Sequence, residues 1–153
     1  MNNFLIRRAD KKDIETLVNF NEAMAIETEN KILDIPTLTN GVTRLLQNPE
    51  NGFYLLAEVD GEVCASLMIT TEWSDWRDGI FWWVQSVFVV PAQRRKGLYS
   101  MMYNHVKELA NANPDVCGFR LYVDKENAPA QSTYEKCGME KTNYLLYEEI
   151  TRK

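Results

Sequence analysis

One segment near the middle of the chain, in which a strand pattern runs directly into a basic turn and a helix, constrains the fold most. The apolar, β-branched run Val87–Val90 ends at Pro91, and the cations Arg94–Lys96 precede Gly97, where a helical pattern begins. A helix leaves the N–H groups of its first turn unpaired and presents the positive end of its dipole there. A phosphate group binds to both, and a glycine lets it approach the backbone. The segment therefore predicts an anion-binding site in a mixed α/β fold.

The composition limits the kind of ligand that this basic turn binds. The chain has 153 residues, 45% of them hydrophobic, and a formal net charge of −5. This length and hydrophobic content predict one folded domain over residues 1–153. Proteins that bind nucleic acid are usually basic overall, so a small anionic ligand is favoured and no nucleic-acid partner is expected.

Cysteine content and the lack of long apolar runs bear on location. The three cysteines are an odd number without metal-ligand spacing, which indicates thiols in a reducing compartment and no bound metal. The N-terminal residues alternate apolar and charged side chains too closely for a signal peptide. No apolar run approaches the ~20 residues that a membrane span needs. We therefore expect a cytoplasmic protein with no membrane partner.

Hydrophobic periodicity and turn signals divide the chain into strands and helices. Asp10 is the expected N-cap of the first helix, with Asp13 in the capping-box position, and the helix is expected to end near Ala25. A loop is expected over residues 27–35. The expected strands are 4–8, 53–59, 63–71, 80–90, 119–123 and 144–149, and the further helices are 37–47, one that begins at 97, and a short one after Asn127.

Two segments resemble the signatures of the GNAT superfamily of N-acetyltransferases. The first family signature is Arg/Gln-x-x-Gly-x-Gly/Ala, and residues 94–99 read Arg-Arg-Lys-Gly-Leu-Tyr. Tyr99 departs from this signature, because the family has a small residue at that place. The second signature is matched in order by Asn127, Ala130, Tyr134, Gly138 and Met139. The order of the expected strands and helices also resembles that of the family.

The resemblance implies a fold and a co-substrate. The implied fold is that of the acyl-CoA N-acyltransferases, a mixed α/β fold of the α+β-like kind. Helices flank a mostly antiparallel central sheet, and its fourth and fifth strands splay apart after a bulge in the fourth. The implied co-substrate is acetyl-CoA, without a metal. Its expected binding residues are Val87, Phe88, Val89, Arg94, Arg95, Lys96, Gly97, Leu98, Tyr99, Ser100, Asn127 and Tyr134.

Within that site the resemblance implies two catalytic groups and leaves the general base open. A backbone N–H near Val89 is the expected donor to the developing oxyanion, and Tyr134 is the expected general acid. For the base, Glu72 at the end of the third expected strand and Glu27 in the expected loop are the candidates. Glu72 is the first choice and Glu27 the second, although a single exposed glutamate is more often a solvated surface carboxylate. Gln85 is no base, but it orients a water molecule if the proton leaves through water.

A cluster of aromatic and acidic residues marks the expected acceptor side. All four tryptophans fall between positions 73 and 83, with carboxylates interleaved. Aromatic faces and carboxylates suit a cationic amine, while a packed hairpin or an oligomer contact explains them equally well. Arg77 either neutralises Asp75 or grips a substrate carboxylate. The expected acceptor-binding residues are Glu27, Glu72, Trp73, Trp76 and Gln85.

The function implied by the resemblance is direct transfer of the acetyl group of acetyl-CoA to a primary amine of a small molecule, with a cationic amine among the candidates. Two alternatives stay open. One is a non-catalytic module that binds CoA or a protein on the same fold, and the other is an acetyltransferase that acts on a protein amine. The exposed aromatic content also leaves a homodimer open.

Overall fold

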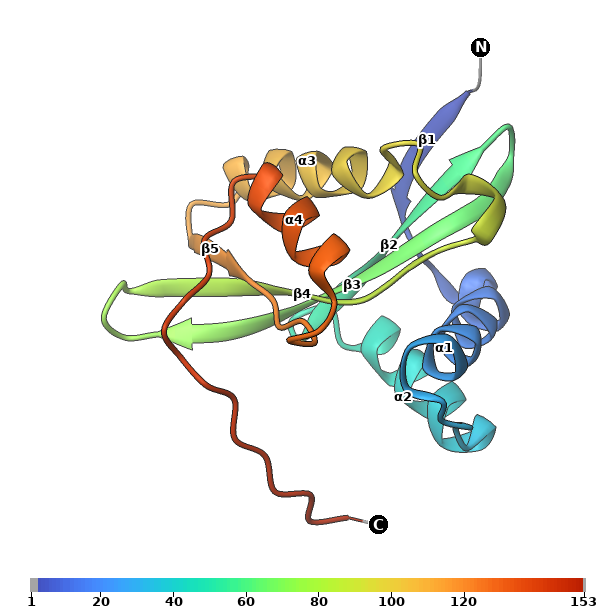
Figure 1. Ribbon diagram of the computed structural model, residues 1–153, viewed down its shortest axis with the longest axis horizontal. Coiled ribbons are helices and arrows are strands. Elements are labelled where there is room, and N and C mark those ends of the chain that lie inside the picture. Colours follow the sequence, from blue (N-terminus) through green and yellow to red (C-terminus); the bar gives the residue numbers. More distant parts are fainter. Residues whose placement is uncertain (1–2, 153) are drawn as a thin grey trace. The chain divides into compact units, whose positions relative to one another are not determined.

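The computed structural model describes residues 3–152 and divides into two compact units. The first unit ends at Tyr122 and contains the whole sheet with helices α1, α2 and α3 (Figure 1). The second unit begins at Val123 and contains helix α4 and the C-terminal segment. The single domain over residues 1–153 stays a prediction.

The elements follow the predicted order, with shifts at several ends. The strands are β1 (Phe4–Arg8), β2 (Gly52–Val59), β3 (Glu62–Ser74), β4 (Gly79–Val89) and β5 (Val116–Arg120). The helices are α1 (Ile14–Glu29), α2 (Ile35–Gln47), α3 (Leu98–Asn111) and α4 (Ala128–Lys136), with 3-10 turns at Lys11–Asp13 and Pro91–Gln93. The mixed fold and its mostly antiparallel sheet are therefore confirmed.

The sheet has the strand order β1-β2-β3-β4-β5, antiparallel up to β4 and parallel between β4 and β5. β5 pairs with β4 only along the segment from Ile80 to Trp83. The remaining part of β4, up to Val89, is paired with β3 on one edge only. The predicted parting of the fourth and fifth strands is therefore present, and it leaves one edge of β4 open over its second half.

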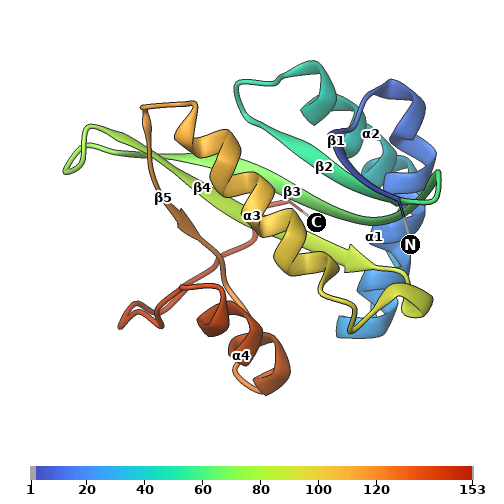
Figure 2. The ribbon, with the colours of Figure 1, turned by 90° about the horizontal axis from the view of Figure 1, so that it is seen from above.

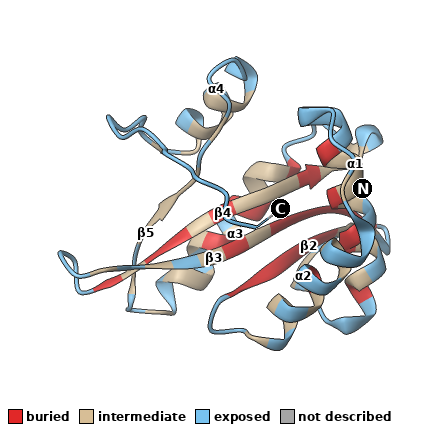
Figure 3. Ribbon diagram, turned by 90° about the horizontal axis from the view of Figure 1, so that it is seen from below, coloured by how far each residue is buried: buried red, intermediate tan, exposed pale blue. Residues whose placement is uncertain are grey.

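Helices cover both faces of the sheet in the first unit (Figure 2). On one face, Leu17 and Val18 of α1 pack with Val42 of α2 against Tyr54 and Leu56 of β2. α3 lies on the opposite face, and its buried residues Leu98, Met102, Tyr103 and Val106 follow helical spacing. Figure 3 shows the buried residues concentrated along the middle strands, between these two layers. Full burial of one leucine contributes about 1.5–3 kcal/mol, so the two layers fix the sheet firmly.

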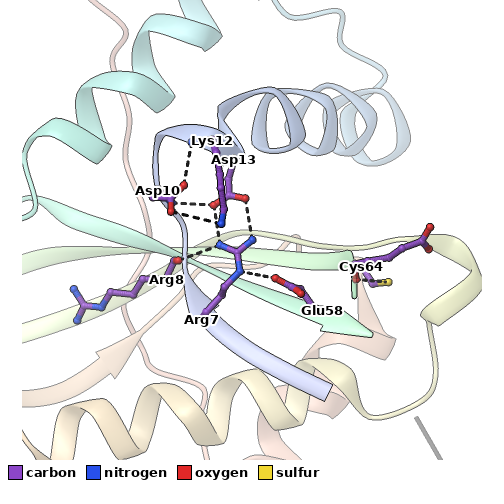
Figure 4. A network of polar contacts seen from close by, with 8 residues as sticks. Arg7, Arg8, Asp10, Lys12, Asp13, Glu58 and Cys64 are labelled. Carbon is purple, nitrogen blue, oxygen red and sulfur yellow. Dashed lines mark hydrogen bonds and ion pairs between the residues drawn. The ribbon is translucent and has the colours of Figure 1, made fainter. Parts of the chain in front are cut away.

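A network of polar contacts fixes the start of α1 onto β1 (Figure 4). Asp10 and Asp13 form the predicted capping box, which is confirmed. The Asp13 carboxylate also accepts two hydrogen bonds from the Arg7 guanidinium, at 2.8 and 3.0 Å, and Arg7 donates a third hydrogen bond to Glu58 of β2. The hydrogen bonds from Arg7 lower the pKa of Asp13, against the opposing effect of its burial. Loss of one partner of such a pair costs about 3–5 kcal/mol where the other stays buried.

Helix α1 is four residues longer than predicted, and this places Glu27 in its last turn rather than in a loop. The helix ends where Asn30 adopts the left-handed conformation with φ 52°, and its N–H donates to Ile26 O. Asn is one of the few residues that tolerate this conformation at a helix end. The sequence offers no glycine or proline near Ala25 to stop the helix sooner.

Two strand predictions near the C-terminus are wrong. β5 covers Val116–Arg120 rather than 119–123. The segment 144–149 forms no strand, and its apolar side chains, such as Leu145 and Tyr147, are exposed. An alternating pattern becomes a strand only where a neighbouring strand accepts its hydrogen bonds, and the second unit contains no other strand among its described residues. In the part of the chain that the structure describes, no helix has the length and apolarity to cross a membrane.

Candidate active site

A bulge in β4 marks the beginning of the candidate site. Ser66 and Met68 of β3 face Phe88 and Gln85 of β4, so two residues of β4 lie opposite the single residue Leu67. Ser86, one of the two, has φ 51°, in the left-handed region that favours glycine. A bulge of this kind interrupts the ladder and bends the strand. The predicted bulge before Pro91 is therefore confirmed.

Past the bulge, the peptide of Val89 faces the open edge of β4. The N–H of Val90 donates to Cys64 O of β3 at 2.8 Å. Successive residues of a strand direct their N–H and C=O groups to opposite edges, so the Val89 groups point away from β3. Arg94 Nε donates to Val89 O at 2.8 Å, which agrees with this direction. The edge of β4 that does not pair with β5 thus presents main-chain groups near the predicted position of the thioester.

The turn after β4 leads into α3, and no side chain at Gly97 blocks access to the start of that helix. Arg95 has φ 62° and Gly97, the N-cap of α3, has φ 78°. A Cβ at Gly97 meets nothing within 4 Å, so here the glycine serves the backbone conformation and the space above it is open. The first intrahelical bond of this turn runs from Met101 N to Gly97 O, and the N–H groups of a first helical turn point out of the N-terminal end of the helix. The first turn holds no acidic residue, so it suits an anion.

The Arg94 guanidinium bonds to other groups of the same chain through all three of its nitrogens. Its two terminal nitrogens contact the two carboxylate oxygens of Glu27, at 2.8 and 2.9 Å, while Nε bonds Val89 O. The hydrogen bond from Arg94 lowers the pKa of Glu27. Arg94 therefore joins the end of α1 to the end of β4. Within residues 3–152, no ion pair or hydrogen bond is assigned to the exposed side chains of Arg95 and Lys96.

Tyr99, which departs from the family signature, lies along the side of α3. Its ring stacks on that of Tyr103, with centroids 6.1 Å apart and planes 9° apart. The Tyr103 ring in turn meets Phe119 of β5 edge-on at 5.7 Å. This aromatic row draws the Tyr99 ring toward the next turn of α3. It gives the bulky residue a packing role in this chain.

A second group of polar side chains lies on the sheet face that α1 and α2 cover in part. Glu72 of β3 accepts hydrogen bonds at Oε1 from Trp83 Nε1 (3.1 Å) and from Arg120 Nη1 (2.7 Å). Beside them Gln85 donates to Thr70 Oγ1 at 2.6 Å. Alternation along β3 places Thr70 and Glu72 on the same face as Met68, which packs against the α1–α2 core. The predicted residues Glu72 and Gln85 are thus brought to one face of the sheet.

The four tryptophans are not brought together. Trp82 is buried and meets Phe53 edge-on at 5.3 Å, and Trp83 bonds Glu72. Trp73 and Trp76 are 62% and 90% exposed near the tip of the β3–β4 hairpin. Because neighbouring strand residues alternate, Trp73 points to the face opposite Glu72. A role for Trp73 and Trp76 in acceptor binding stays a prediction.

Sequence reasoning missed Trp83 and Arg120 as members of this polar group. Arg120 belongs to a strand that pairs across a crossover, so no spacing along the chain connects it with Glu72. For Trp83, a signal was present, since residues 83 and 85 share one face of a strand. The guanidinium of Arg120 also lies 3.7 Å from the centroid of the Phe81 ring.

The second unit holds the two other predicted site residues. Asn127 accepts a hydrogen bond from Ala130 N at 3.2 Å and so caps α4, as predicted. Tyr134 lies in the same helix, and burial raises the pKa of its phenol. A raised pKa keeps a phenol protonated, as a general acid requires. Within the described residues, no three His, Cys, Asp or Glu side chains are arranged to hold a metal ion.

Comparison with known proteins agrees with this fold. Residues 16–139 match the acetyltransferase (GNAT) family. A possible acetyltransferase from Clostridium difficile 630 has 41% identity and a TM-score of 0.90, with 98% of this chain and 99% of that chain covered. No curated protein matches this chain.

Two more distant structures share the fold. One is a predicted acetyltransferase with acetyl-CoA from Clostridium acetobutylicum, with 22% identity, a TM-score of 0.78, and coverage of 97% of this chain and 96% of that chain. The other is an aminoglycoside N-acetyltransferase in complex with CoA, with 15% identity, a TM-score of 0.81, and coverage of 99% of this chain and 97% of that chain. The chain therefore belongs to the acetyltransferase (GNAT) family, and the predicted resemblance is confirmed.

Proposed function

We propose that the protein transfers the acetyl group of acetyl-CoA directly to a primary amine of a small molecule. The observation that carries this proposal is the open edge of β4 at the Val89 peptide. The N-terminus of α3 follows this edge within a few residues along the chain. An anion site and a free strand edge are what a diphosphate and an extended amide-containing arm require. The family membership supports the acetyl donor.

The residues present fit that co-substrate. The positive end of the α3 dipole and the open space at Gly97 suit the diphosphate, with Arg95 and Lys96 supplying charge. The open edge at Val87–Val89 pairs with the amide groups of the arm. Phe88 itself is buried and packs on Phe20 of α1, with centroids 5.0 Å apart, so it supports the site by fixing the strand.

The chemistry assigns a task to each polar group. An alkyl amine has a pKa near ~10 and must lose a proton before it attacks. Glu72 receives that proton at its second oxygen, directly or through a water molecule that Gln85 orients. The Val89 N–H stabilises the carbonyl oxygen as it becomes negative. Tyr134 returns a proton to the departing thiolate, whose pKa is roughly 8.5 by analogy with cysteine.

A thermal-shift titration with acetyl-CoA and CoA tests the proposal. A ligand at 100 times its Kd adds about 2.7 kcal/mol to the free energy of unfolding. The variant pair Arg95→Gln and Lys96→Gln removes two exposed cations of the turn and is expected to weaken the shift, while Lys11→Gln, an exposed cation far along the chain, leaves it unchanged. No shift at millimolar concentrations of either compound contradicts the proposal.

The exposed tryptophans favour one second candidate, a module that binds CoA or a protein without catalysis. Trp76 is 90% exposed, and tryptophan is enriched at protein interfaces. The loss of thioester absorbance with a panel of amines separates the two candidates. Turnover with any amine excludes the module, and persistent absence of turnover with acetyl-CoA bound establishes it.

A further inference from the structure

We propose that Arg120 makes this site selective for primary amines that also carry a carboxylate or phosphate a few bonds from the nitrogen. This inference rests on the proposed acetyl transfer and narrows its acceptor. From the tryptophans and carboxylates, the sequence left a cationic amine among the candidate acceptors. The structure assigns a different balance of charge to the polar group on the sheet.

The first observation concerns the free oxygen of Glu72. Both hydrogen bonds assigned to this carboxylate, from Trp83 and from Arg120, end on Oε1. Within residues 3–152, no hydrogen bond is assigned to Oε2, and the side chain is 41% exposed. A carboxylate accepts as many as four hydrogen bonds, so Oε2 is available to an ammonium or amine group.

The second observation concerns the unused donors of Arg120. A guanidinium carries five N–H donors in one plane, and within the described residues the hydrogen bond assigned to Arg120 uses Nη1 alone. The Phe81 ring, 3.7 Å from the guanidinium carbon, supports its face and fixes its plane. The group is 29% exposed. A fixed, partly exposed guanidinium with donors left over suits a carboxylate or phosphate.

The third observation concerns the two guanidiniums around the Phe81 ring. A second guanidinium, that of Arg77, lies 5.1 Å from the same Phe81 ring. Two cations thus flank one ring, and Glu72 is the carboxylate that bonds to one of them. Asp75 and Asp78 lie exposed in the hairpin turn, and no ion pair is assigned to either within residues 3–152. With Glu72, these make three carboxylates against two guanidiniums, so the expected selectivity depends on the open donors of Arg120 and not on net charge.

The contact between the two residues sets the size of the acceptor. Glu72 Oε1 and Arg120 Nη1 are 2.7 Å apart. A ligand that bonds the open side of both groups must therefore hold its amine and its anionic oxygens close together. Amino acids and amino phosphates of few atoms satisfy this condition, and long polyamines do not.

Matched pairs of acceptors test the inference. β-Alanine is compared with its amide and phosphoethanolamine with ethanolamine, with spermidine as the polycation, and the initial rate is followed by loss of the thioester absorbance. We expect kcat/KM to be about 10- to 100-fold higher for the anionic member of at least one pair, which corresponds to about 1.4–2.8 kcal/mol. The pair that shows the preference distinguishes carboxylate from phosphate. Equal rates within both pairs, or a better rate with spermidine, overturn the inference while the acetyl transfer stands.

Arg120→Gln shows whether this residue causes the preference. It is expected to raise KM far more for the anionic member than for the neutral member, so that the preference disappears. Arg120→Lys is expected to restore part of it, because the charge returns without the planar fork. Arg44→Gln, which removes an exposed cation of α2, is the control. An equal loss for both members of a pair in Arg120→Gln contradicts the inference.

A binding measurement keeps the result independent of turnover. Thermal shift of the protein with CoA and β-alanine or phosphoethanolamine is compared between the wild type and Arg120→Gln. An Arg120-dependent shift supports the inference even where the transfer itself fails. Absence of turnover with every amine, with no such shift, overturns both the inference and the proposed function.

Discussion

Two arginine–glutamate pairs in the first unit have the same composition and differ in how completely they are bonded. Both carboxylate oxygens of Glu27 bond to Arg94. All three guanidinium nitrogens of Arg94 are bonded, the two terminal ones to Glu27 and Nε to Val89 O. Glu72 uses one oxygen on Arg120 and leaves the other open. A closed pair holds chain segments together, whereas an open pair has capacity left for a ligand.

The comparison favours one of the two glutamates that the sequence offered as the base. Arg94 lowers the pKa of Glu27, and a carboxylate with a lowered pKa and two occupied oxygens is a weak proton acceptor. Glu72 has an open oxygen on the face of the sheet that carries Gln85 and Trp83. We therefore propose Glu72 as the base, while Glu27 holds Arg94.

The largest expected effect is that of Glu72→Gln on acetyl transfer. Gln keeps an oxygen for Trp83 and Arg120 but takes up no proton, so kcat/KM for the acceptor is expected to fall about 10²- to 10⁴-fold. The paired variant Glu27→Gln is expected to lower it less than about tenfold, because the oxygen that Arg94 needs is still present. Initial rates with both variants measure the difference. A larger loss in Glu27→Gln reverses the assignment.

The next largest expected effect is that of Tyr134→Phe, which tests the proposed general acid. Tyr134→Phe removes one phenol oxygen and is expected to lower kcat about 10- to 100-fold, because the thiolate then leaves without a proton. The thermal shift with acetyl-CoA is expected to stay near that of the wild type. Unchanged turnover removes Tyr134 from the acid role, and a lost thermal shift assigns it to binding instead.

A smaller effect concerns stability and is measured by two double-mutant cycles under chemical denaturation. The cycle on Glu27 and Arg94 is expected to give a coupling of about 0.5–1 kcal/mol, near the upper end for exposed pairs, because the contact is bidentate. The cycle on Glu72 and Arg120 is expected to give less than about 0.5 kcal/mol, since one contact links them. Equal couplings would show that the difference in bonding has no energetic consequence.

The smallest effect is the pH dependence of the closed pair. The pKa of Glu27 is lower in the folded chain than its ordinary value of 4.5, so the folded state holds fewer protons near that pH. The stabilisation is therefore fully present above about pH 4.5 and is lost as the pH falls through the lowered pKa. Because the pair is exposed, the loss is a few tenths of a kcal/mol.

Melting curves between neutral pH and acid pH measure this effect. The advantage of the wild type over Glu27→Gln is expected to shrink as the pH falls. Glu50→Gln, at an exposed loop position, provides the control with no such trend. A constant difference across the range contradicts the role assigned to Arg94.

Local patterns predicted the parts of the fold that depend on neighbours in the chain. The capping box at Asp10 and Asp13, the adjacent strands expected over 53–59 and 63–71, and the basic turn before Gly97 are all present. These features depend on contacts a few residues apart, where spacing determines geometry. The predicted end of α1 was wrong because Asn30 stops the helix through a conformation that leaves little signal in the sequence.

The candidate site depends on contacts between segments far apart in the sequence, and local patterns were insufficient to predict these contacts. Glu72 and Arg120 are separated by 48 residues, and Glu27 and Arg94 by 67. The sequence therefore offered two glutamates as candidate bases, without showing which of them has both carboxylate oxygens bonded to an arginine. The strand predicted over 144–149 failed for the same reason, since its pattern carries no information about a partner strand.

The sequence by itself determined the family, the order of most strands and helices, and the basic turn before α3. Each of these follows from residues close together in the chain, through backbone conformation and side-chain spacing. The tertiary structure alone decided which carboxylate keeps an open oxygen. That choice depends on where β5 and the end of α1 bring their charged side chains, and hydrogen bonds form between groups that folding brings within about 3 Å, at any separation in the sequence.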